Sequence, residues 1–112
     1  MSTHWTAGVI DNDGNVTACY VNFDGSPRTA WRAMRGLAER SGCFEAVLSK
    51  IERAQREGGI RRIESNGELE TYGDYRGEKS KGNEWVHNSR QEWLGTTLLI
   101  REDMSVVSGY SL

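Results

Sequence analysis

The chain has 112 residues, with 14 lysines and arginines against 16 aspartates and glutamates, so its formal net charge is −2. This length suits one domain, residues 1–112, and the near balance of charge argues against a strongly basic polyanion binder and against an acidic mimic of DNA. The apolar share of 37% predicts a thin core, in which the four tryptophans supply much of the buried area.

No apolar run approaches the roughly 18 residues of a membrane span, and the N-terminus lacks the pattern of a signal peptide. We therefore expect a cytosolic protein without membrane contact. Cys19 and Cys43 do not form a CxxC pair, and we expect both to be small core residues in a reducing compartment. A disulfide or a reactive thiol is the alternative.

Residues 6–23 are typical of a β-hairpin, because the turn-forming run Asp11–Asn15 separates two β-forming segments. Alternate residues of the returning strand share one face, and we expect this face to meet the helices: Thr17, Cys19, Val21 and Phe23.

A first helix is predicted to begin with Ser26 as N-cap and Pro27 in the first turn, and to end at Ser41-Gly42. Gly36 should weaken this helix by about 1 kcal/mol relative to alanine. Its apolar stripe is Trp31, Met34, Leu37 and Ala38.

A second helix follows, with the clearest periodicity in the chain, and should end at Gly58-Gly59. Its apolar stripe is Phe44, Val47, Leu48, Ile51 and Ala54.

Residues 60–72 are predicted to form a second hairpin around Asn66-Gly67. A two-residue loop would place charged residues opposite apolar ones, so we favour a three-residue loop with Gly67 in the left-handed position. This register pairs Ile63 with Leu69, Arg62 with Glu70, and Ile60 with Tyr72.

The rest of the chain should contain a long polar loop over residues 73–90, a strand over 92–100, a turn at 102–103 and a closing strand over 104–110. We therefore expect an α+β fold of order ββ-αα-ββ-ββ, in which two consecutive helices pack on one face of an antiparallel sheet. Edge-to-edge pairing of such sheets would give a homodimer.

No cofactor and no metal are expected, and we assign no catalytic residue. The run Asp11–Gly14 is rich in calcium-loop residues, but that motif would require Val9 and Tyr20 as ligands. His4 and His87 have no cysteine or carboxylate at metal-binding spacing.

Two segments resemble motifs of a known family. Residues 20–27, Y-V-N-F-D-G-S-P, resemble the Y-V-H-W-D-G-[YS]-P strand–turn–helix of small uncharacterised bacteriophage and prophage proteins, and residues 72–78 loosely resemble their Y-x-R-D-R-G-E segment. The aromatic-rich strand from Gln91 is also similar, and the order of the pieces matches from about Ala7 to Met104. Asn22 and Phe23 replace the histidine and tryptophan, so a proton-transfer role is not carried over. The resemblance implies a phage or mobile-element setting and no particular activity. A protein encoded by a phage would be located in the cytosol of the host cell.

The first functional hypothesis is a small interaction protein that binds a host protein, for example as an inhibitor of a host-defence system in the manner of anti-CRISPR proteins. Interfaces rely heavily on Trp, Tyr and Arg, so Trp85, Tyr75 and Arg76 are the expected anchors. The other candidate binding residues are Asp74, Glu78 and Asp24, although Asp24 could instead cap the local backbone.

Two alternatives use other chemistry. A small enzyme or nucleotide- or anion-binding domain could use a carboxylate as general base beside an arginine, with the residues Asp24, Asp74, Arg76 and Glu78. A nucleic-acid-binding protein could instead use a basic patch of Arg53, Arg56, Arg61 and Arg62, unless these arginines are solvated or paired.

Overall fold

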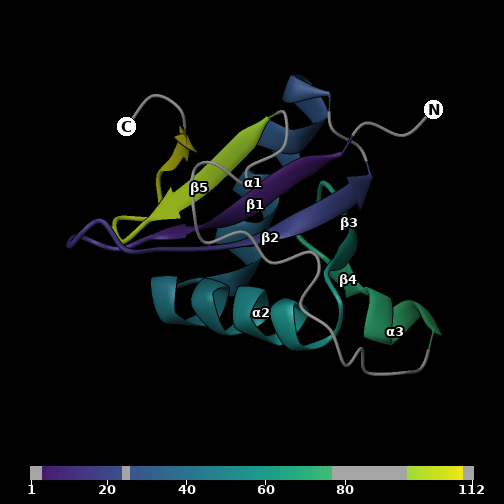
Figure 1. The fold of residues 1–112 in the computed structure, drawn as a ribbon. Helices are drawn as coiled ribbons and strands as arrows, with labels where there is room; N and C mark the ends of the chain where they lie inside the picture. Colours follow the sequence, from purple (N-terminus) through teal and green to yellow (C-terminus); the bar gives the residue numbers. More distant parts are fainter. Residues whose placement is uncertain (1–3, 24–25, 77–95, 110–112) are drawn as a thin grey trace.

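The computed structural model of the chain describes residues 4–23, 26–76 and 96–109, without the side chains of Phe23 and Arg76. Within these ranges the elements succeed one another as ββααββαββ (Figure 1). Their bounds are β1 Trp5–Ile10, β2 Val16–Phe23, α1 Pro27–Ser41, α2 Phe44–Arg56, β3 Ile60–Ile63, β4 Leu69–Thr71, α3 Tyr72–Arg76, β5 Thr97–Arg101 and β6 Val106–Ser108. The predicted α+β class is confirmed, and the short helix α3 is added to the predicted order.

The strands form one sheet in the order β4-β3-β2-β1-β5-β6. The prediction of an antiparallel sheet is wrong for two pairings, because β2 runs parallel to β3 and β1 runs parallel to β5. The hairpin pairings β1–β2, β3–β4 and β5–β6 are antiparallel as expected. Turn signals determine only these local pairings, whereas the helical connection between β2 and β3 returns the chain to the starting end of β2.

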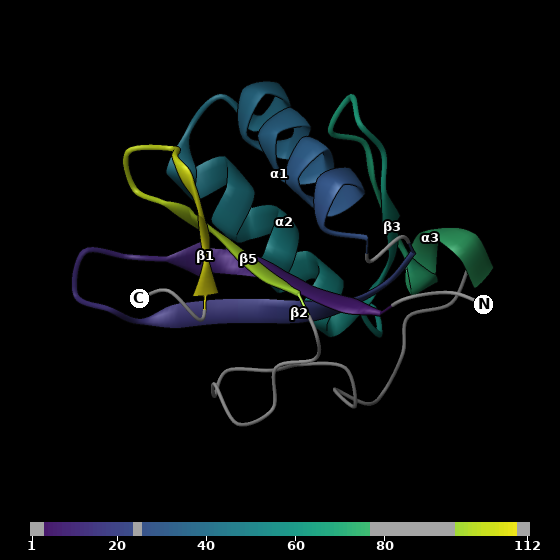
Figure 2. The same cartoon turned by 90° about the horizontal axis from the view of Figure 1, so that it is seen from above.

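Both long helices lie on one face of the sheet, as predicted (Figure 2). They bury the expected stripes together with one face of the β1–β2 hairpin, including Trp5, Cys19 and Val21. The fully or largely buried helix residues are Ala30, Ala33, Met34, Leu37, Ala38, Val47, Ile51 and Ala54, and Trp31, Phe44 and Leu48 pack against them in part. The helical periodicity therefore correctly predicted which faces of α1 and α2 pack into the core.

The ends of α1 follow the sequence signals. Ser26 occupies the N-cap position in an extended conformation, but its Oγ donates to Thr29 Oγ1 at 2.8 Å and does not cap a helical N–H group. Pro27 follows at the start of the helix. At the other end Gly42 has φ 82°, and its N–H donates to the carbonyl of Ala38 at 3.0 Å. A glycine is favoured there because other residues rarely adopt this conformation.

The turn between β1 and β2 is organised by Asp11. Its Oδ1 accepts hydrogen bonds from the backbone N–H groups of Asp13 and Asn15, each at 2.9 Å. These bonds, led by that from Asn15, lower the pKa of Asp11. Asp11 therefore has a structural role in this turn. Among the described residues no group of three His, Cys, Asp or Glu side chains is placed to hold a metal ion.

In the β3–β4 hairpin the first two predicted pairs are confirmed, and Gly67 has the expected positive φ of 88°. The third pair is wrong, because Ile60 lies opposite Thr71 and not opposite Tyr72. The register shifts between Ile60 and Arg62, where β3 holds one residue more than β4.

The C-terminal part departs from the expected boundaries. Residues 72–76 of the predicted polar loop form α3, and residues 77–95 lie outside the described ranges. The strand expected to start at residue 92 is described from Thr97. The turn at residues 102–103 is confirmed, but it also includes Met104, which has φ 71° and was expected in the closing strand. Asp103 Oδ1 holds this turn by accepting from Ser105 N–H at 2.9 Å.

The two cysteines differ. Cys19 is buried as predicted, and burial raises the pKa of its thiol to about 12. The prediction is wrong for Cys43, which is exposed at the N-cap of α2 because that position precedes the buried stripe. Among the described helices none is long and apolar enough to cross a bilayer.

Candidate functional site

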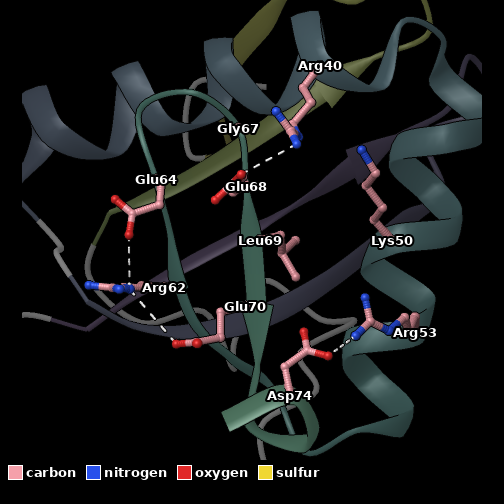
Figure 3. A pocket seen from close by; sticks show the side chains of 10 residues that line it. All are labelled: Arg40, Lys50, Arg53, Arg62, Glu64, Gly67, Glu68, Leu69, Glu70 and Asp74. Atoms are coloured by element: carbon pink, nitrogen blue, oxygen red, sulfur yellow. Dashed lines mark hydrogen bonds and ion pairs between the residues drawn. The ribbon is translucent and has the colours of Figure 1, made fainter.

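A groove of about 430 Å³ lies between the β3–β4 hairpin and α2, closed at one end by the last turn of α1 (Figure 3). We call it the β4–α2 groove. It is lined by four cations, four carboxylates and two uncharged residues: Arg40, Lys50, Arg53, Arg62, Glu64, Glu68, Glu70, Asp74, Gly67 and Leu69. Its lining is therefore polar and contains equal numbers of opposite charges.

The hairpin wall of the groove is held on α1 by a contact between two glycines. A Cβ atom on Gly36 would lie 2.2 Å from the carbonyl oxygen of Ser65, and one on Gly67 would lie 2.2 Å from the carbonyl oxygen of Gly36. Only glycine permits so close an approach of two backbones. Gly36 was expected to weaken α1, and its place in the structure explains why it is there.

Most charges of the groove are neutralised by ion pairs. Arg40 Nη2 lies 3.5 Å from Glu68 Oε1, and Arg62 Nε lies 3.1 Å from Glu64 Oε1. Because the side chains of both pairs are about half exposed, each pair contributes little to stability, of the order of 0–1 kcal/mol.

A second network fixes α3 at the end of the groove. The N–H of Thr71 donates to Asp74 Oδ2 at 3.0 Å, and the N–H of Asp74 donates to Thr71 Oγ1 at 2.9 Å. Thr71 Oγ1 also donates to Glu57 Oε1 at 3.1 Å. Arg53 joins both carboxylates, through Nε at 2.7 Å to Glu57 Oε2 and through Nη2 to Asp74 Oδ1. The hydrogen bond to Glu57 is the main reason why the pKa of Arg53 is raised.

Beside the groove, the side chains of Tyr75, Arg61 and Glu70 form a ladder on the hairpin and α3, which we call the Tyr75 surface. Tyr75 is 57% exposed. The Arg61 Cζ atom lies 4.1 Å from the centre of its ring, and Arg61 Nη1 lies 2.7 Å from Glu70 Oε1. The hydrogen bond to Glu70 raises the pKa of Arg61. Arg61 thus makes a cation–π contact with the exposed ring of Tyr75, and its position is fixed by the ion pair with Glu70.

Lys50 differs from the other cations of the groove. Its Nζ donates to Ser41 Oγ at 2.8 Å, and among the described residues no carboxylate lies within 4.0 Å of it. Partial burial lowers the pKa of Lys50, and the neighbouring charge of Arg40 lowers it further.

The structure distributes the predicted binding residues unevenly. Asp74 and Tyr75 lie on α3, whereas the backbone of Arg76 ends this helix and its side chain is outside the description. Asp24, Glu78 and Trp85 lie outside the described residues. The site that would join Asp24 and Glu78 to Asp74 and Arg76, and the role of Trp85 as an interface anchor, therefore stay predictions.

The four arginines of the predicted basic patch occupy two elements. Three of them have carboxylates within 4.0 Å: Arg53, Arg61 and Arg62. Arg56 is exposed on α2 and has no ion pair in the described ranges. The pairs leave less positive charge for phosphate groups than the arginine count suggests.

Sequence reasoning missed several residues of the site, among them Arg40, Lys50, Glu57, Glu68 and Thr71. One available signal was the spacing of Lys50 and Arg53, which lie three residues apart and therefore on the same side of α2. The position of Glu57, beyond the end of the helix, gave no comparable signal.

Comparison of the chain with family models, with curated proteins and with solved structures gave no match.

Proposed function

We propose that this chain is an interaction domain that binds a host protein through the Tyr75 surface. Following the resemblance to phage proteins, a bacterial defence protein is the first candidate partner, which the chain would inhibit by occupying its surface. The observation that carries the proposal is the exposed ring of Tyr75 stacked on Arg61.

The chemistry of the surface favours a protein partner. Tyrosine and arginine are enriched among the residues that supply most of the binding energy at protein interfaces. Tyr75 offers a large apolar area with a polar tip, and Arg61 beneath its ring is already paired with Glu70. A partner can therefore cover the ring of Tyr75 without leaving the charge of Arg61 unpaired, because Glu70 already compensates that charge.

The rigidity of the surface supports the same proposal. Arg61 is held by Glu70, and α3 is held by the reciprocal hydrogen bonds of Thr71 and Asp74. A side chain that is already ordered loses less conformational entropy on binding, by about 0.5–1.5 kcal/mol for each residue that is immobilised beforehand.

Affinity capture from a lysate of the native host tests the proposal with matched variants. Wild-type protein and Tyr75→Phe should retain one common partner, whereas Tyr75→Ala should lose it, because only alanine removes the ring. Arg56→Ala is the control, since Arg56 is an exposed arginine of α2 without an ion pair in the described ranges. A partner that Tyr75→Ala still retains at wild-type yield would refute the proposed surface.

A further inference from the structure

The charges of the β4–α2 groove do not cancel completely within the fold. Arg40 is paired with Glu68, Arg62 with Glu64, and Arg53 with Asp74. Figure 3 shows Lys50 pointing into the upper end of the groove, and none of the carboxylates drawn there is paired with it.

The fourth carboxylate of the groove is not available to Lys50 either. Glu70 Oε1 lies 2.7 Å from Arg61 Nη1 and 3.9 Å from Arg62 Nε. Lys50 therefore has one hydroxyl partner, Ser41 Oγ, and two donors of its ammonium group left over. One positive charge of the groove is thus uncompensated by the described residues.

The surroundings of Lys50 make this charge costly. Lys50 is partly buried, and both burial and the charge of Arg40 lower its pKa. A single negative charge between Arg40 and Lys50 would compensate both effects. A dianionic group would fit less well, because Glu68 borders the same space and would repel the second charge.

Among the described strands, β4 lies at one edge of the sheet and borders the same groove. No further described strand pairs with β4 beyond β3, and Thr71 donates its N–H to Asp74, a groove residue, and not to β3. Because backbone groups alternate along a strand, Leu69 directs its N–H and C=O to the same side as Thr71. An extended peptide could therefore pair with this edge by adding a strand.

We propose that the β4–α2 groove binds an acidic side chain of an extended polypeptide, with the carboxylate held by Lys50 and Arg40 and the backbone paired with the edge of β4. The carboxylate site follows from the geometry of the groove, and the assignment of its carrier to a protein partner rests on the proposed function.

The test uses blocked N-acetyl-glutamate-amide as the probe, its neutral glutamine counterpart as the matched control, and NMR shifts of Ser41 and Lys50 at constant ionic strength as the readout. The glutamate probe should bind saturably in the millimolar range, and the glutamine probe should not. Equal binding of both probes would overturn the role of charge, and tighter binding of inorganic phosphate would overturn the assignment to a single carboxylate.

Variants locate the site. Lys50→Met keeps the apolar stem and should weaken binding of the glutamate probe at least about tenfold, because it removes a charge-assisted hydrogen bond. Arg56→Met, also on α2 but outside the groove, should leave the affinity unchanged. The probe comparison on wild-type protein stands even if Lys50→Met does not fold, and an unchanged affinity in folded Lys50→Met would overturn the proposal.

A short peptide tests whether the carboxylate belongs to an extended polypeptide that pairs with β4. The acetylated and amidated peptide Thr-Val-Glu-Val-Thr should bind more tightly than the blocked glutamate, with added shifts at Leu69, and equal affinity would overturn the pairing with β4. Tyr75→Ala should leave both affinities unchanged. Failure of the carboxylate site and failure of the Tyr75 surface are therefore seen in different measurements.

Discussion

Substitution of Gly36 by alanine distinguishes local helix propensity from the packing of the β3–β4 hairpin. In the middle of a helix, alanine is more favourable than glycine by about 1 kcal/mol. Local propensity therefore predicts that Gly36→Ala stabilises the protein. The structure predicts the opposite sign, because the new Cβ would lie 2.2 Å from Ser65 O and 2.8 Å from Gly67 N.

The magnitude follows from the atoms that must move. Both are backbone atoms, so the overlap cannot be relieved by turning a side chain. Forcing extra atoms into a packed interior costs about 1–3 kcal/mol, and a contact against backbone belongs at the upper end of this range. After the gain in propensity is subtracted, Gly36→Ala should lose about 2 kcal/mol of unfolding free energy. For a domain of this size the melting temperature should fall by roughly 8 °C.

Urea denaturation of wild type, Gly36→Ala and Ser49→Ala measures the effect. Ser49 is exposed on α2, so its replacement should show the ordinary gain of a few tenths of a kcal/mol from propensity alone. Hydrogen exchange of the Gly67 N–H, which donates to Glu64 O at 2.9 Å, should accelerate in Gly36→Ala. A Gly36→Ala protein as stable as wild type, or more stable, would refute the role of this contact.

Three further outcomes are expected. Because the bond from Asn15 lowers the pKa of Asp11 below its ordinary 3.8, ionised Asp11 stabilises the fold above that pH and this contribution disappears as the pH falls through the folded-state pKa. Below pH 3.8 the free energy of unfolding of Asp11→Ala should therefore fall less steeply with decreasing pH than that of wild type, and equal slopes would contradict this. Thr71→Val should lower the free energy of unfolding, measured by urea denaturation, by about 1–3 kcal/mol, because Glu57 Oε1 and the Asp74 N–H lose their hydrogen bonds to a buried hydroxyl. A loss below about 0.5 kcal/mol would argue against the network. A thiol reagent should label Cys43 rapidly in the native protein and Cys19 only after denaturation, and equal rates would show that Cys19 is not buried as described.

The sequence predicted the parts of the fold that are encoded locally. The Asp11 turn, the Ser26-Pro27 start of α1 and the periodicity of α2 each depend on residues close together in the chain. The parallel pairings β2–β3 and β1–β5 depend on segments far apart, and no local pattern encodes them. Hence the class, the two long helices and the hairpin pairings were predictable, but α3 and the two parallel pairings were not.

The candidate site was predictable only in part. Tyr75 and Asp74 were identified from residue type in a polar segment; Asp74 lines the β4–α2 groove, and Tyr75 is exposed on the surface beside it. The ion pair of Arg53 with Asp74 joins α2 to α3, which meet only through the tertiary fold, whereas Arg61 and Glu70 belong to the two strands of the predicted β3–β4 hairpin. The predicted register paired Glu70 with Arg62 and did not assign a partner to Arg61. Gly36 could not be predicted to matter either, because the need for glycine at this position arises only from its contact with the β3–β4 hairpin.

The central claim is that the Tyr75 surface contacts a host protein, and site-specific photocrosslinking tests it most directly. A benzophenone amino acid is placed at position 75 in one variant and at position 56 in another, and both are irradiated in host cells. We expect a discrete adduct of one host protein from position 75 and none from position 56. The absence of an adduct at position 75, or the same adducts from both positions, would contradict the claim.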